Sequence, residues 1–293
     1  MAAGSTVPRR LLGRQLKQLR EKSGVPQAEA CRLIEIAPQT LWRIESGQPG
    51  PKLKEIYIEA LCRLYRATPE DAAALSALVA ETKSPGWWHT YGDVVPTYFD
   101  LYLGLEESAR RLTSLHLGLL PGLLQTPEYR RAVVWAAFPG MASSEVESRV
   151  EIASKRQARL RESPELLTLT MYLGEAALRY RLGGAGVMAD QLRHIAEVSE
   201  LPAVTVRALP LKIENPLPVI TGSFTLMEFP SHPTSRLTEP PVVYIEGFTG
   251  ALYLDKPGEI DEYRLACKVI RSVAMDERET RQLIEKLAKE FEK

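Results

Sequence analysis

The stretch PQAEACRLIEIAPQTLWRIESG, residues 26–47, decides the fold of the N-terminal part of this chain. Pro26 begins a short predicted helix that ends near residue 34, because proline suits the first turn of a helix. A second short helix begins at Pro38 and ends before Gly47, and glycine is favoured directly after a helix. Two short helices joined by a tight turn are the pattern of a helix-turn-helix.

The side chains of this stretch agree with two helices that cross steeply. Cys31 supplies a small side chain where the two backbones touch. Leu41 and Ile44 form an apolar stripe along the second helix. The other faces of that helix carry Gln39, Thr40, Trp42 and Arg43. A helix with one buried face and one polar face suits insertion into the major groove of DNA.

Further helices are predicted on both sides of this stretch. Their ranges are 9–22, 53–66 and 68–82. The sequence Ser84-Pro85-Gly86 then breaks the chain. We therefore predict that residues 1–83 form a five-helix DNA-binding domain.

Residues 84–293 are predicted to form a second domain that mixes helices and strands. The predicted helices are 96–112, 126–137, 144–161, 187–199 and two at the C-terminus, and the predicted strands are 115–119, 166–173, 204–208, 223–229, 242–246 and 251–254. Ser144 with Glu147, and Asp276 with Glu279, have the spacing of capping boxes. The predicted fold class is therefore α+β: an N-terminal helix-turn-helix bundle, then an α+β domain with a mainly antiparallel sheet.

The charge of the chain is divided unevenly between its two parts. Residues 1–67 contain twelve Lys and Arg against six Glu and no Asp, a net charge of +6, whereas the whole chain has a net charge of zero. A basic part joined to an acidic part is expected when only one end meets polyphosphate. Chance clustering on a solvated surface is the alternative.

Composition excludes several other classes of protein. The sequence has no apolar run long enough for a membrane span and no export signal, and its three cysteines are too few for a disulfide framework. We expect a cytoplasmic protein with no membrane association. The four histidines have no metal-ligand spacing, and no nucleotide-binding or hydrolase motif is present, so we expect no metal, no cofactor and no enzymatic activity.

The quoted stretch and the helix before it resemble the Xre family of helix-turn-helix domains, the family of Cro and the phage repressors. The matching residues are Arg20, Gly24, Gln27, Glu29, Ile36, Thr40, Ile44, Glu45 and Gly47. This resemblance implies a transcriptional regulator that binds double-stranded DNA.

The resemblance also implies roles for individual residues. Gln27 contacts a phosphate, whereas Gln39 and Arg43, assisted by Thr40, read base edges. Arg20 and Glu45 form a partly buried ion pair between the first and third helices. Further residues that we expect at the DNA surface are Pro38, Trp42, Ser46 and Lys52.

Two positions depart from the Xre pattern. Glu35 replaces the usual glycine of the turn, so it must tolerate a left-handed backbone or change the shape of the turn. Ala37 replaces the usual Ser or Thr that caps the recognition helix, which removes a cap worth about 1 kcal/mol. Pro38 partly compensates, because it fixes the first helical dihedral.

The rest of the chain resembles the C-terminal domain of actinobacterial Xre-type regulators that are often described as antitoxin-like. The resemblance is carried by Pro121-Gly-Leu-Leu-Gln-Thr126, with Trp88, Tyr91, Tyr102, Tyr129, Glu175-Ala-Ala-Leu178 and Val243-Tyr-Ile-Glu246 among the other matching residues. Members of this group are often encoded beside a small partner protein. Two functions follow: a homodimeric repressor that responds to a ligand or partner protein, or an antitoxin-like protein that sequesters a small partner and regulates its own gene.

Three groups of residues in the second domain leave alternatives open. The aromatic cluster after residue 86 either lines an apolar effector pocket, forms a dimer or partner surface, or packs as core: Trp87, Trp88, Tyr91, Tyr98 and Tyr102, with Glu106 beside them. The carboxylates Glu106, Glu175 and Glu246 either converge or are salt-bridged and solvated. The basic side chains Arg149, Lys155, Arg156, Arg159 and Arg161 form either a second phosphate surface or a solvated helix face.

Overall fold

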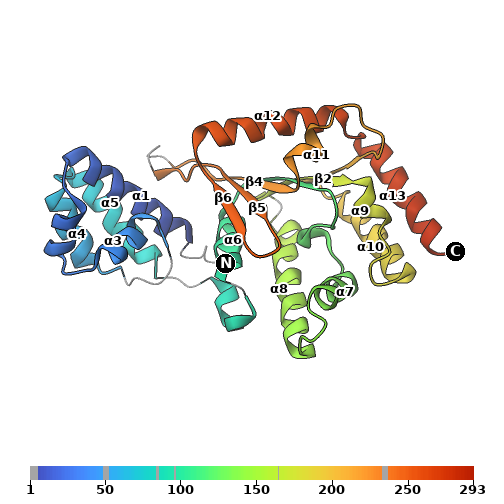
Figure 1. Ribbon diagram of the computed structural model, residues 1–293, viewed down its shortest axis with the longest axis horizontal. Coiled ribbons are helices and arrows are strands. Elements are labelled where there is room, and N and C mark those ends of the chain that lie inside the picture. Colours follow the sequence, from blue (N-terminus) through green and yellow to red (C-terminus); the bar gives the residue numbers. More distant parts are fainter. Residues whose placement is uncertain (1–5, 49–52, 84–85, 96, 164, 233–236) are drawn as a thin grey trace. The chain divides into compact units, whose positions relative to one another are not determined.

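The computed structural model describes residues 6–48, 53–83, 86–95, 97–163, 165–232 and 237–293 (Figure 1). The chain divides into two compact units. The N-terminal unit contains residues 1–90, 99–108 and 229–239, and the C-terminal unit contains residues 91–98, 109–228 and 240–293. Among the described residues, no helix has both the length and the apolar character that a membrane crossing requires.

The five helices predicted for residues 1–83 are all present in the N-terminal unit. They are α1 (Thr6–Ser23), α2 (Gln27–Leu33), α3 (Pro38–Glu45), α4 (Glu55–Leu64) and α5 (Pro69–Glu81). Their apolar faces enclose one core, to which Leu12, Leu16, Leu41 and Leu61 contribute fully buried side chains. The hydroxyl of Thr68 caps α5 by accepting a hydrogen bond from the backbone N–H of Asp71 at 3.1 Å.

Two later segments of the chain also belong to the N-terminal unit. The first is most of helix α6 (Thr97–Ser108), and the second is residues 229–239. Leu237 is buried in the core of the helix bundle. The carboxylate of Glu239 accepts hydrogen bonds from Arg10 Nε at 2.7 Å and from Arg14 Nη2 at 3.1 Å, and both arginines lie on α1. The predicted boundary after residue 83 stays a prediction, and these units differ from it in being discontinuous along the sequence.

The C-terminal unit is built on a mixed sheet, which the described residues form in the order β3-β2-β1-β4-β5-β6. The strands are β1 (Arg111–His116), β2 (Thr168–Gly174), β3 (Val204–Leu209), β4 (Phe224–Glu228), β5 (Val242–Glu246) and β6 (Ala251–Leu254). β1, β2 and β3 are parallel to one another, whereas the pairings β1–β4, β4–β5 and β5–β6 are antiparallel. The α+β class is confirmed. The antiparallel pairings join the strands from β1 through β4 and β5 to the edge strand β6.

The chain has further helices and 3-10 segments before, between and after these strands. They are η1 (Trp87–Val94), η2 (Gly122–Leu124), α7 (Pro127–Ala137), α8 (Ser143–Glu162), α9 (Glu175–Arg179), α10 (Ala185–Val198), α11 (Leu217–Thr221), α12 (Pro257–Val273) and α13 (Glu277–Phe291). Helix α12 packs on one face of the sheet, where Ile260 and Ile270 meet Phe224 and Val243. Helices α10 and α13 pack against each other (Figure 1).

The first predicted strand was placed too late in the sequence. The structure has α6 ending at Ser108 and β1 covering Arg111–His116, whereas the apolar run had favoured 115–119. Four of the six residues of β1 are polar, and one of them, Ser114, is buried with its hydroxyl donating to Thr225 Oγ1 on β4 at 2.9 Å. When the polar side chains of a strand form hydrogen bonds to a neighbouring strand, its sequence lacks the apolar pattern from which strands are predicted.

One of the two predicted capping boxes is confirmed and the other is wrong. Asp276 Oδ1 accepts from the backbone N–H of Glu279, and Glu279 Oε2 accepts from that of Asp276. Helix α8 instead begins at Ser143, with Ala142 as its N-cap, so Ser144 already lies inside the helix. Glu147 pairs across to α7, where Arg131 Nε donates to its carboxylate at 2.7 Å.

His116, the last residue of β1, makes the stability of the chain depend on pH. Burial lowers the pKa of its imidazole to about 4, from 6.5. The unfolded chain therefore binds a proton that the folded chain does not, so stability falls as the pH drops through this window. Between pH 8 and pH 5 we expect His116 alone to cost about 2 kcal/mol. Urea unfolding of the wild type and of His116→Gln at both pH values measures this difference, and an equal loss in both proteins would contradict it.

Candidate nucleic-acid interface

Helices α2 and α3 form a helix-turn-helix that the rest of the bundle supports. Ala30 and Cys31 of α2 are buried, as are Leu41 and Ile44 of α3, and all four belong to the core of the N-terminal unit. The small side chains on α2 allow the two helices to approach closely, as the sequence predicted. One face of α3 is thereby fixed against the bundle.

The turn between these helices keeps a left-handed backbone at Glu35. Its φ is +53°, in the region that normally favours glycine. The backbone N–H of Ile36 donates to the carbonyl of Cys31 at 3.0 Å, which closes the turn. Glu35 thus tolerates the left-handed conformation, at a cost of about 1–2 kcal/mol because its Cβ lies close to the backbone carbonyl.

Helix α3 begins without a side-chain cap, as its sequence predicted. Ala37 is the N-cap, with an extended backbone, and Pro38 occupies the first helical position. The backbone N–H of Thr40 donates to the carbonyl of Ala37 at 2.9 Å. Because no side chain of this cap accepts from the first amides, the amino end of α3 is left open to an outside acceptor.

Most side chains assigned to the DNA surface lie on the outer face of α3. Pro38, Gln39, Trp42 and Arg43 are exposed, and Trp42 is 56% exposed although it is a large apolar side chain. The others in the described range, Gln27, Thr40 and Ser46, are partly exposed. Lys52 lies outside the described residues.

Helices α1 and α3 touch backbone to backbone, which fixes the orientation of α3. A Cβ on Gly13 of α1 would lie 2.9 Å from the carbonyl oxygen of Glu45 and still closer to that of Ile44. Gly47, directly after α3, has a φ of +67°, and a Cβ there would lie 2.7 Å from Cα of Arg10. Both positions therefore require glycine.

The structure brings Arg20 and Glu45 together between α1 and α3. Arg20 Nε donates to Glu45 Oε1 at 2.6 Å, and Arg20 Nη2 donates to Glu45 Oε2 at 2.9 Å. The side chain of Glu45 is 5% exposed and that of Arg20 is 15% exposed. Hydrogen bonding to Glu45 raises the pKa of Arg20 above its ordinary value. This two-pronged pair locks α3 to α1 in one register.

Half of the aromatic set after residue 86 packs as core, which is one of the three alternatives that the sequence left open. Trp88 is 1% exposed, and its indole N–H donates to the carboxylate of Asp100. Tyr102 and Glu106 are also buried, and the tyrosine hydroxyl donates to Glu106 Oε2 at 2.7 Å. These three side chains are core residues, because their polar groups are satisfied within the chain.

The other members of the aromatic set are placed differently. Trp87 and Tyr91 are partly exposed, and Tyr91 lies in the C-terminal unit, where Lys155 Nζ is 5.0 Å from the centre of its ring. The side chain of Tyr98 lies outside the description. The five described side chains of the set therefore do not form one surface.

The three carboxylates whose convergence the sequence left open have different partners. Glu106 is bound by Tyr102, whereas Glu175 accepts from Arg179 Nη2 at 2.6 Å and from the backbone N–H of Leu211 at 3.0 Å. Glu246 interacts with Arg130 and Arg156, and burial raises its pKa. Among the described residues, no group of three or more His, Cys, Asp or Glu is arranged to hold a metal ion.

Basic side chains of α8 are largely engaged within the C-terminal unit. Arg159 Nη2 donates to the carbonyl of Ala109 at 2.7 Å, and Lys155 pairs with Glu151 at 3.2 Å. Arg156 is 8% exposed. These contacts favour a structural role for the three side chains over a second phosphate surface.

Sequence reasoning missed two contributors to the placement of the helix-turn-helix. Gly13 lies inside a predicted helix, where glycine is usually a weak point and not a requirement. Glu239 is more than 200 positions away from the arginines that it binds, the shorter separation being 225. The net charge of +6 over residues 1–67 was a signal that these arginines need acidic partners, but it could not name the partner.

Two family models match the chain. The model described as a helix-turn-helix domain matches residues 11–75, which include α2 and α3. The model described as a domain of unknown function, DUF5753, matches residues 99–286. No curated protein and no solved structure matches the chain. Since the second model covers more than half of its length, the chain belongs to the DUF5753 family, with a helix-turn-helix domain at its N-terminal end.

Proposed function

We propose that the chain is a sequence-specific, Xre-type transcriptional regulator that reads double-stranded DNA with α3. The observation that supports this best is the outer face of α3, where Gln39 and Arg43 are exposed while Leu41 and Ile44 are buried on the opposite side. The match to a helix-turn-helix model supports DNA binding in general. No catalytic reaction is part of the proposal.

The chemistry of α3 suits the major groove. A guanidinium binds the O6 and N7 acceptors of guanine with two hydrogen bonds, and a glutamine amide binds the N6 and N7 groups of adenine in the same way. Each such pair discriminates against a wrong base by about 1–3 kcal/mol. The uncapped amino end of α3 and the side chain of Gln27 are suited to phosphate oxygens.

The finer parts of the proposal concern assembly and control. One helix-turn-helix reads a single half-site, so we propose a homodimer on a palindromic operator whose half-sites are about one helical turn apart. We propose that the chain acts as a repressor and that the C-terminal unit changes DNA affinity when an effector binds. Such control requires the effector to favour one state of the protein over another. The alternative of an antitoxin-like protein that sequesters a small partner stays a prediction.

Operator mapping followed by substitution tests the proposal. Genome-wide mapping of bound DNA identifies the operator, and fluorescence anisotropy then measures the affinity of full-length protein for it. Arg43→Ala and Gln39→Ala are each expected to weaken operator binding about tenfold or more, with little further loss when the base that they read is changed.

Arg63→Ala removes one positive charge, as Arg43→Ala does, and is the control for that loss of charge. Arg63 lies on α4, its side chain is 77% exposed, and its nearest carboxylate partner is Glu59 at 3.8 Å. This variant is expected to lower affinity slightly and equally for all sequences. Unchanged discrimination between operator and altered operators in both α3 variants would refute the assignment of Gln39 and Arg43 as reading residues.

A further inference from the structure

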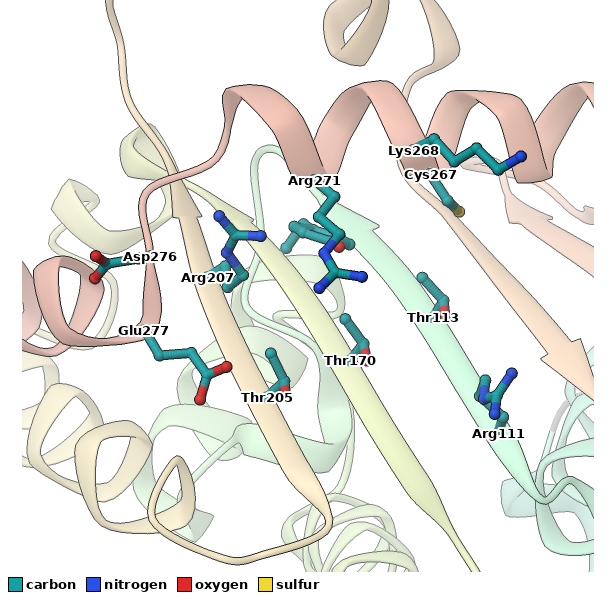
Figure 2. A pocket seen from close by; sticks show the side chains of 11 residues that line it. Arg111, Thr113, Thr170, Thr205, Arg207, Cys267, Lys268, Arg271, Asp276 and Glu277 are labelled. Carbon is teal, nitrogen blue, oxygen red and sulfur yellow. The ribbon is translucent and has the colours of Figure 1, made fainter.

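A hollow of about 600 Å³ lies on one face of the sheet in the C-terminal unit, over β1, β2 and β3 (Figure 2). Helix α12 and the beginning of α13 border it. Its volume falls in the range of about 300–1,000 Å³ that is common for small-molecule sites. The hollow takes no part in the candidate DNA interface, whose residues all belong to the other unit.

The floor of the hollow is a row of three threonines. Thr113, Thr170 and Thr205 are directly opposite one another on three neighbouring parallel strands, so their side chains emerge from the same face. All three are partly exposed, and the described part of the chain offers their hydroxyls no hydrogen-bond partner. Each hydroxyl is therefore able both to donate to a ligand and to accept from it.

Two arginines stand over this row. Arg207 of β3 is fixed, because its Nε donates to the carbonyl of Met275 at 2.7 Å and its Nη2 donates to that of Ala274 at 2.8 Å. Arg271 lies in the last turn of α12, and Figure 2 shows its side chain pointing from the helix toward the strands. Within the described residues no carboxylate lies within ion-pair distance of Arg271.

The charge balance of the lining favours an anion. Basic side chains outnumber acidic ones, with Arg207, Lys268 and Arg271 against Asp276 and Glu277; Arg111 also lines the hollow but is paired with Glu228 at 3.5 Å. The carboxylate of Asp276 is already occupied as the cap of α13. Arg207 and Arg271 both line the hollow, and phosphate suits guanidinium groups well.

Two other lining residues narrow the chemistry of the ligand. Tyr172 is the one aromatic side chain among the lining residues described, and it is 4% exposed, so it offers no surface for a base to stack on. Burial raises the pKa of the Cys267 thiol to about 11, so it remains protonated and is a poor nucleophile near neutral pH. The lining is therefore built for reversible polar binding.

We propose that this hollow binds a small phosphorylated compound that carries several hydroxyl groups and no aromatic ring, such as a sugar phosphate. Arg207 and Arg271 hold the phosphate, and the row of threonines binds the hydroxyls. The inference deepens the proposed function, because it names the chemical class of the effector. Ligand binding is measurable without DNA, so a negative result here is distinct from a failure of DNA binding.

Isothermal titration calorimetry of the full-length chain tests this inference. The probes are ribose 5-phosphate, glucose 6-phosphate and glycerol 3-phosphate, with unphosphorylated ribose, citrate and adenosine monophosphate for comparison. At least one of the sugar or polyol phosphates is expected to bind, and more tightly than all three comparison compounds. Arg271→Met is expected to weaken that binding about tenfold or more, and Thr170→Val about threefold.

Matched variants outside the hollow serve as controls. Arg278→Met removes one exposed positive charge from α13, and Thr168→Val removes one hydroxyl from the exposed start of β2. Neither residue lines the hollow, and both variants are expected to bind as the wild type does. The inference is overturned if none of the three sugar or polyol phosphates binds, if Arg271→Met binds as tightly as Arg278→Met, or if ribose, citrate or adenosine monophosphate binds most tightly.

Discussion

Replacing Gly13 by alanine is expected to destabilise the N-terminal unit by about 3 kcal/mol, an effect typical of overpacking. The new Cβ would overlap the carbonyl oxygen of Ile44 and press on that of Glu45, and both belong to the backbone of α3. Backbone atoms have no alternative rotamer, so α1 and α3 must move apart. The better helix propensity of alanine, worth about 1 kcal/mol, offsets only part of this cost. Amide hydrogen exchange in the peptides that cover α1 and α3 measures the effect.

Gly186→Ala is the matched control for this change. Gly186 lies in the first turn of α10, and a Cβ there meets no atom within 4 Å. The same substitution is therefore expected to leave stability unchanged or raise it by up to about 1 kcal/mol. Equal effects of the two substitutions would show that the close approach of α1 to α3 is not a constraint.

Glu45→Ala is the second change with a large expected effect, a loss of about 3 kcal/mol in the stability of the N-terminal unit. The substitution leaves the Arg20 guanidinium between α1 and α3 without its two hydrogen bonds, in a place where its side chain is only 15% exposed. Removing one partner of a buried ion pair costs more than the pair contributes, because the remaining charge is left desolvated. Hydrogen exchange in α3 again provides the measurement.

Two further variants separate this cause from others. Glu59→Ala breaks an exposed ion pair with Arg63 and is expected to cost less than about 1 kcal/mol. The double variant Arg20→Met with Glu45→Leu removes both charges together, and it is expected to regain most of the stability that Glu45→Ala loses. If Glu45→Ala cost no more than Glu59→Ala, the ion pair would have no role in fixing α3.

The helix-turn-helix could be predicted closely from the sequence because its determinants are local. The stripe formed by Leu41 and Ile44, the proline at position 38 and the glycine at position 47 lie within one short segment, and the structure has α3 at Pro38–Glu45. The missing cap at Ala37 also follows from a single residue, whereas the sequence left open whether the turn at Glu35 stays left-handed, as it does in the structure. Local rules of capping and periodicity suffice for such a segment.

The sheet and the site in the C-terminal unit depend on contacts between distant residues, and they could be predicted only in part. The position of β1 was missed because Ser114 is satisfied by Thr225, a partner 111 positions away. The three threonines form a row only because of the register of the strands, and this register could not be inferred from the sequence. The sequence left pocket, surface and core open for the aromatic cluster, because burial of Trp88 depends on helix α6, whose Asp100 receives its indole N–H. Composition alone does not distinguish a tryptophan at a surface from one in a core.

Residues 229–239 belong to the N-terminal unit, and this limits how its helix-turn-helix domain can be exchanged between proteins. A recombination event that joins residues 1–83 to a foreign effector domain would leave Leu237 and Glu239 behind, so Arg10 and Arg14 would lose the carboxylate that both of them bind. The N-terminal unit is thus compact in space but discontinuous along the sequence. A chimaera that retains the stability of this unit must therefore include residues 229–239 as well. Recombination is then expected to transfer the two parts of the chain together.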